Sequence, residues 1–191
     1  MAIFSRFYSR QGLWSLFLVT ALPLHIWTFF LAFRDFDWVT ERTNSWDAVG
    51  VVAYGLTFTL VECSIVFIVA ALLGLLVSPK WSEKKRIAVM GVLAIVLALW
   101  SMFNQIYFLR ETKLPAQFVG FYAATGRPLL ALYATALIFA SLSAALPAYG
   151  ILRSDKVEKA VTEGFERLSV LMILYLVFDA AALVILVIRN I

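Results

Sequence analysis

Five long apolar segments dominate this sequence, and each is long enough to cross a lipid bilayer. A transmembrane helix needs about 20 apolar residues, because it rises about 1.5 Å per residue through a hydrocarbon core of about 30 Å. The segments are Gly12–Phe33, Ala48–Val77, Ile87–Leu109, Leu129–Leu152 and Leu168–Ile188. Backbone N–H and C=O groups must be paired within hydrocarbon, so each segment is expected to be a helix. The sequence therefore predicts an all-α, polytopic integral membrane protein, in which residues 1–191 form one five-helix transmembrane bundle.

The composition of the chain is also typical of a protein whose surface mostly contacts lipid. Hydrophobic residues make up 63% of the chain and charged residues 15%, whereas soluble domains are about 45–50% apolar and about 25% charged. The net charge of +4 does not indicate nucleic-acid binding, because the Lys and Arg residues lie mostly between the apolar segments. In that position they are topology signals.

The distribution of these basic residues predicts the orientation of the chain. Ten Lys and Arg residues lie on the side of the N-terminus and six on the opposite side. Cytoplasmic loops carry the excess of positive charge, so we expect an N-in/C-out topology in the plasma (inner) membrane of a prokaryote. The count includes Arg6, Arg86, Arg110 and Arg189.

Residues 155–167, just before the last segment, have the pattern of an amphipathic helix. Val157, Ala160, Val161, Gly164 and Phe165 recur at helical spacing among charged residues. We expect a cytoplasmic amphipathic helix that runs into the last transmembrane segment.

The fourth segment carries a stripe of small residues along one helical face. Ala136, Ala140, Ala144 and Ala148 follow one another at intervals of four. Small residues let helix backbones approach closely in lipid, so this stripe is expected to contact another helix of the chain or of a partner subunit.

Three ionisable side chains lie inside the apolar segments, namely His25, Glu62 and Asp179. Counting along each helix places all three near the middle of the bilayer, where a charge costs at least about 2.5–3.5 kcal/mol. No Lys or Arg lies deep within any segment, so His25 is the only cation that the chain offers to the two acids. Asn104 and Gln105 add polar groups near the outer end of the third segment.

These polar residues admit two interpretations. On the functional one they form a proton or ion relay or a polar ligand site, because ionisable residues within membranes often mark such sites. On the structural one they form a hydrogen-bonded knot that fixes helix register, or they bind a partner subunit. Convergence of the three ionisable residues would favour a relay, and acids that point out of the bundle would favour a partner.

Catalytic, metal-binding and cofactor motifs are absent from the sequence. One histidine cannot supply two axial haem ligands, and neither metal-ligand spacings nor a nucleotide-binding glycine motif occur. The single cysteine, Cys63, lies in an apolar segment and is expected to be a small buried hydrophobe. We therefore expect no catalytic residue, no metal and no cofactor, and we favour a protein that is not an enzyme.

Three functions remain open at this point. The preferred one is a non-catalytic subunit, or an assembly or scaffold factor, of a larger membrane complex, with other membrane subunits or a second copy as partners. The second is a small transporter or an ion or proton channel in which Glu62 and Asp179 line a polar path. The third is a lipid-binding or lipid-modifying protein that uses an aromatic outer surface near Trp27, Trp100 and Tyr122.

Overall fold

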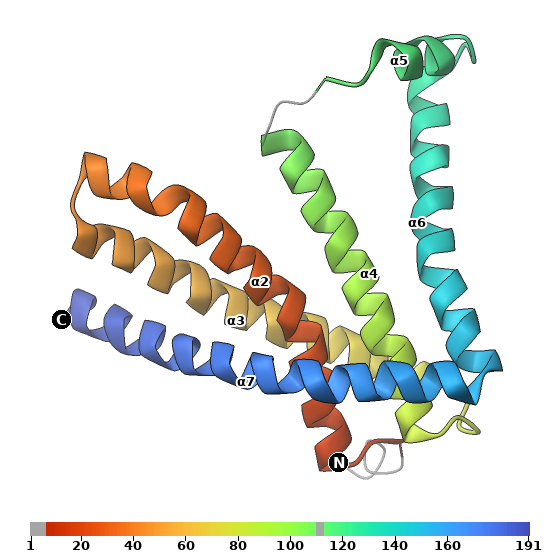
Figure 1. The fold of residues 1–191 in the computed structure, drawn as a ribbon, viewed down its shortest axis with the longest axis horizontal. Coiled ribbons are helices and arrows are strands. Elements are labelled where there is room, and N and C mark those ends of the chain that lie inside the picture. Colours follow the sequence, from red (N-terminus) through yellow and green to blue (C-terminus); the bar gives the residue numbers. More distant parts are fainter. Residues whose placement is uncertain (1–6, 110–112) are drawn as a thin grey trace.

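The computed structural model describes residues 7–109 and 113–191, which form helices joined by short connections (Figure 1). Six helices are assigned in this part of the chain. They are α2 (Arg10–Arg42), α3 (Ser45–Leu76), α4 (Glu83–Leu109), α5 (Ala116–Ala123), α6 (Pro128–Arg153) and α7 (Asp155–Asn190). Arg6 and Arg110, which entered the count of basic residues, lie outside the described residues.

Within the described ranges, five helices are long and apolar enough to cross a membrane. The remaining one, α5, has only 8 residues. The same part of the chain contains no strand. The predicted all-α class with five long apolar helices is confirmed, and the chain is a multi-pass membrane protein.

Two of the helices extend well beyond the apolar segments. α2 continues past Phe33 to Arg42, because no Gly or Pro interrupts it before Asn44, whose side chain accepts a hydrogen bond from the Asp47 backbone N–H and caps α3. α7 is one helix of 36 residues, in which the stretch 155–167 runs without a break into the apolar part. At about 1.5 Å per residue α7 is about 54 Å long, which exceeds a hydrocarbon core of about 30 Å.

The helices form two groups that meet at one end of the molecule. α2, α3 and α7 pack side by side, whereas α4 and α6 diverge from them toward the end that carries α5 (Figure 1). α4 packs on α2, and α6 contacts α4 and α7. A large hydrophobic cluster lies where the groups meet and includes Leu16, Ala70, Met90 and Ile151. The divergence leaves long apolar surfaces uncovered by protein, and in a membrane these surfaces contact lipid.

A glycine allows three helices to approach one another near this junction. A Cβ atom on Gly91 of α4 would lie 2.6 Å from the Phe165 ring of α7 and 2.9 Å from a methyl group of Val19 on α2. Such distances are shorter than real Cβ contacts, so any larger residue would displace these buried side chains. The junction therefore depends on the absence of a side chain at this position.

Arg86, which the sequence analysis counted as a loop charge, is a buried residue of α4. It is 1% exposed, and its guanidinium donates hydrogen bonds to the carbonyl oxygens of Gly74, at 2.8 Å, and Ser78, at 3.2 Å. These carbonyls lie at the C-terminal end of α3, where backbone acceptors lack partners within the helix. Beside it, burial raises the pKa of Tyr8 to about 12, so this phenol stays a neutral donor to the Ala71 carbonyl, at 3.4 Å. Arg86 thus closes the end of α3 and ties it to α4.

At the opposite end of the bundle, Arg189 ties the end of α7 to the start of α3. Its guanidinium donates to Oδ1 of Asp47 at 2.8 Å and to the backbone carbonyl oxygen of Trp46. It also lies over the Trp46 ring, with the guanidinium carbon 5.5 Å from the ring centroid. Both ends of α3 are therefore held by an arginine from another helix.

The alanine stripe of α6 is only partly covered. Ala148 packs against the hydrophobic cluster at the junction, Ala140 and Ala144 are half-buried, and Ala136 is exposed. The stripe is less covered by neighbouring helices toward α5, because α6 and α4 diverge from the other helices in that direction (Figure 1).

Candidate functional site

The two acids predicted near the middle of the membrane have different surroundings. Asp179 on α7 is 2% exposed and contacts His25 on α2, which is 0% exposed. Glu62 on α3 is exposed and lines an open cavity. The structure therefore brings together two of the three ionisable residues and places the third apart from them.

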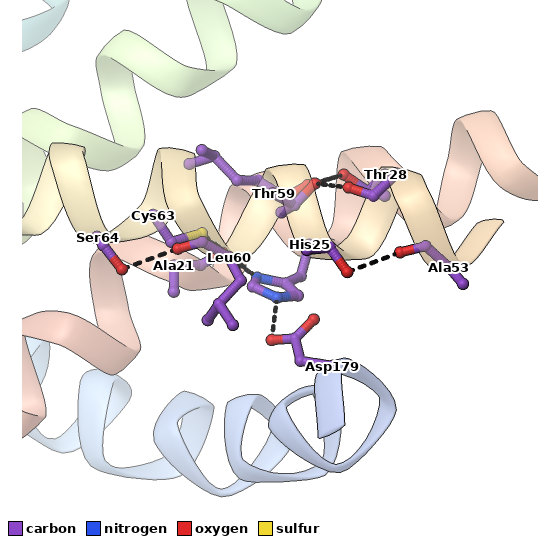
Figure 2. A network of polar contacts seen from close by, with 12 residues as sticks. Ala21, His25, Thr28, Ala53, Thr59, Leu60, Cys63, Ser64 and Asp179 are labelled. Carbon is purple, nitrogen blue, oxygen red and sulfur yellow. Dashed lines mark hydrogen bonds and ion pairs between the residues drawn. The ribbon is translucent and has the colours of Figure 1, made fainter. Parts of the chain in front are cut away.

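The imidazole of His25 bridges two helices. Figure 2 shows the ring between α3 and α7, directed at the carboxyl group of Asp179. Nε2 of His25 lies 2.9 Å from Oδ2 of Asp179. Nδ1 lies 2.9 Å from the backbone carbonyl oxygen of Ala21, one turn earlier in α2. Together these contacts fix the orientation of the ring and join α2 to α7.

The partners of the ring determine where its protons lie. A carbonyl oxygen only accepts hydrogen bonds, so Nδ1 of His25 carries a proton. Its N–H donates a hydrogen bond to the carbonyl oxygen of Ala21. On the other side of the ring, either Nε2–H donates to an ionised Asp179, or a protonated Asp179 donates to Nε2. One proton is shared in both cases, and the pair carries no net charge. A neutral pair is much less costly to bury in hydrocarbon than a single ion.

Weakly polar and aromatic groups enclose this pair. Cys63 is 0% exposed, and its Sγ lies 3.5 Å from Nδ1 of His25 and 3.7 Å from the carbonyl oxygen of Ala21. The ring of Tyr175 stacks on the imidazole, with the centroids 6.0 Å apart. Oδ1 of Asp179 has no hydrogen-bond partner among the described residues. The pair is thus sealed from its surroundings, which suits a contact that holds helices together.

A second polar contact joins α2 to α3 on the side away from α7. The hydroxyl oxygens of Thr28 and Thr59 are hydrogen-bonded to each other (Figure 2). Each hydroxyl also lies near a carbonyl oxygen four residues earlier in its own helix, that of Leu24 and that of Gly55. Thr28 could not be identified from the sequence, because a threonine hydroxyl in an apolar helix is commonly satisfied by its own backbone.

Glu62 lines an open cavity of about 560 Å³ between α2, α3 and α4. This volume falls within the range of about 300–1,000 Å³ that is usual for ligand sites. The lining on α4 runs from Met90 to Gln105, which corresponds to about 22 Å of helix. Ile65 and Val69 of α3 line the cavity and are about half exposed, at 56% and 50%, so the cavity is open to the bilayer.

Polar and apolar residues gather at opposite ends of this cavity. α3 and α4 run in opposite directions, so Leu73 lies toward the end that holds Met90, and Glu62 lies toward the end that holds Gln105. The Glu62 end is also lined by Trp27, Thr28 and Ser101. The other end is lined by Val69, Ala70, Leu73, Met90, Leu93 and Ala94. The cavity is therefore amphipathic along its length.

A second cavity, of about 320 Å³, adjoins the polar end of the first. Trp27, Thr28, Glu62 and Gln105 line both cavities. The second one continues along α2 and α3 to Asp35, whose carboxylate is paired with Arg34 at 2.6 Å. Glu62 lies where the two cavities meet. In the described part of the chain its carboxyl group has neither a hydrogen bond nor an ion pair.

The other polar and aromatic residues singled out from the sequence do not gather at one site. The side-chain carbonyl of Gln105 accepts a hydrogen bond from the indole N–H of Trp27 at the polar end of the cavity. Asn104 is exposed and donates to the carbonyl of Trp100, at 2.9 Å. Trp100 itself donates to the hydroxyl of Ser143 on α6, at 2.8 Å, and Tyr122 lies on α5. Of the aromatic residues expected to form one outer surface, Trp27 is the one that lines the cavity.

Comparison of the chain with protein-family models, with curated protein sequences and with solved structures found no match. The class of the protein therefore follows from its fold alone, as a multi-pass membrane protein. The candidate site adds one unpaired acid in an amphipathic cavity and one sealed histidine–aspartate pair.

We predict that His25 and Asp179 are coupled in stability. His25→Leu leaves the buried Asp179 carboxyl group without a partner, which is expected to cost about 1–3 kcal/mol or more. The double variant His25→Leu/Asp179→Leu removes both polar groups and is expected to lose less stability than His25→Leu alone. Unfolding of the purified variants in mild detergent measures both losses, and a double variant at least as destabilised as His25→Leu would contradict the coupling.

Proposed function

We propose that this protein binds a lipid-like amphiphile, without catalysis, in the cavity between α2, α3 and α4. The observation that carries this proposal is the separation of polar and apolar lining along an open cavity. The polar group of the ligand lies at Glu62 and Gln105, and its hydrocarbon chain extends toward Leu73 and Met90. Each buried methylene group contributes about 0.8 kcal/mol relative to water, although a ligand taken from lipid gains less.

The length of the cavity suits a hydrocarbon chain. Its lining on α4 extends over about 22 Å of helix, from Met90 to Gln105. A lipid chain spans one leaflet of about 15 Å, and the cavity accommodates this length.

A channel is less well supported than a binding site. An ion path across the bilayer needs polar groups or water along its whole length. The cavity is apolar from Val69 to Leu73 on α3 and from Met90 to Ala94 on α4. Asp179, the second acid of the expected path, is sealed with His25 on the far side of α2 and α3.

We further propose that the N-terminus faces the cytoplasm and the C-terminus the outside, in the plasma membrane of a prokaryote. The support is the excess of Lys and Arg on the N-terminal side. A cysteine introduced after Asn190, in a background with Cys63→Ala, is expected to react with a membrane-impermeant thiol reagent applied to intact cells. Reaction only after the cells are lysed would reverse the orientation and leave the cavity unaffected.

A subunit role in a larger membrane complex is the second candidate. It is supported by α6, whose apolar 18-residue stretch has no buried residue, and by the exposed end of its alanine stripe at Ala136. Close packing of small residues against another helix drives association in lipid. Recovery of the chain as a lone monomer from mild detergent would contradict this candidate.

We predict that Ala94→Trp blocks ligand binding by filling the apolar end of the cavity. A side chain that displaces two methylene groups of the ligand removes up to about 1.6 kcal/mol, roughly tenfold in affinity. The probe is a long-chain alcohol with a photoreactive group on its chain, and crosslinks on α3 and α4 are mapped by mass spectrometry. Ala145→Trp, on the exposed face of α6, is the matched control and is expected to crosslink like the unchanged protein. Equal crosslinking of all three proteins would overturn the proposal.

A further inference from the structure

The unpaired carboxyl group of Glu62 limits which ligands fit the cavity. It lies near the middle of α3, exposed at the junction of two cavities. A carboxylate in the hydrocarbon core is costly unless a proton or a cationic partner neutralises it. Among the described residues no Lys, Arg or His forms an ion pair with Glu62. His25 is paired with Asp179, and Arg34 is paired with Asp35. A cation that arrives with a ligand would neutralise this carboxylate, because the described residues supply none.

We propose that the ligand is a single-chain amphiphile whose polar group is a protonated amine bound to Glu62. This inference rests on the proposed function and specifies the chemical class of its ligand. An ammonium and a carboxylate form a pair without net charge, which removes most of the cost of an ion in hydrocarbon. Hydrogen bonds between such charged groups are stronger than those between neutral ones.

The other groups at this end of the cavity suit an ammonium. A primary ammonium has three N–H donors and no acceptor, so it needs acceptors beyond Glu62. The hydroxyl oxygens of Thr28 and Ser101 and the side-chain carbonyl of Gln105 line the same end. Arg34, whose charge would oppose an ammonium, is held by its ion pair with Asp35.

A bare metal ion fits this place less well than an amine. Within residues 7–109 and 113–191, no group of three or more His, Cys, Asp or Glu side chains could hold a metal ion. Metal cations of the hard type take six or more oxygen ligands, whereas Glu62 is the one carboxylate at the first cavity. An amine also brings a hydrocarbon chain that fills the apolar end.

The number of hydrocarbon chains on the ligand follows from the same geometry. A two-chain lipid holds its headgroup at the bilayer surface, so bringing its amine to Glu62 would draw a polar headgroup toward the middle of the membrane. A single-chain amine has no other polar group to bury, and its chain lies along Leu93 and Leu73. The proposed ligand therefore resembles a long-chain primary amine.

Three photoreactive probes with the same chain test this inference on the full-length protein in nanodiscs. They end in a primary amine, an alcohol and a carboxylate. The amine is expected to crosslink to α3 and α4 with at least about tenfold higher affinity than the alcohol, because a hydrogen bond between charged groups replaces a neutral one. The carboxylate is expected to bind most weakly, since it meets a like charge.

The variant Glu62→Gln is expected to bring amine binding down to the level of the alcohol and to leave alcohol binding unchanged. The matched control, Glu41→Gln, alters an exposed acid of α2 away from both cavities and is expected to keep the amine preference. Equal binding of amine and alcohol to the unchanged protein would overturn this inference and leave the proposed function standing. Failure of every probe to label α3 and α4 would overturn both.

Discussion

The cost of an unneutralised charge in hydrocarbon is the constraint on which this structure depends. Asp179 and His25 avoid this cost by pairing with each other. They share one proton across a 2.9 Å contact between α7 and α2. The carbonyl of Ala21 and the ring of Tyr175 hold the imidazole in place, and Cys63 of α3 closes over it. Because these groups come from three helices, satisfying the buried acid also assembles α2, α3 and α7 as one packed unit.

Glu62 of α3 takes no part in this contact, and the divergence of α4 leaves a cavity beside it. α4 packs on α2 near the junction and separates from α3 toward α5 (Figure 1). The space between them is polar where Glu62 and Gln105 lie and apolar near Leu73 and Met90. Two acids at similar depth therefore have opposite roles in our account, in which Asp179 holds helices together and Glu62 faces a ligand.

The sequence predicted the helices much better than their relative rotation. Long apolar segments identify transmembrane helices, because backbone groups in lipid leave no alternative. Counting residues predicts a similar depth for His25, Glu62 and Asp179, but it does not predict which residues surround them. Cys63 and Glu62 are adjacent in sequence and about 100° apart around α3, and no apolar-to-polar asymmetry indicates which of them faces α7. Arg86 was misread for a related reason, since a basic residue near a helix end serves equally as a loop charge or as a cap for another helix.

The different surroundings of Glu62 and Asp179 can be measured directly by chemical modification in native membranes. An apolar carbodiimide enters the bilayer and reacts with the protonated form of those carboxyl groups that it can reach, and mass spectrometry then identifies the modified residues. The account predicts an adduct on Glu62 and none on Asp179 while the protein is folded. An adduct on Asp179 at a comparable rate, or a Glu62 that does not react, would contradict it.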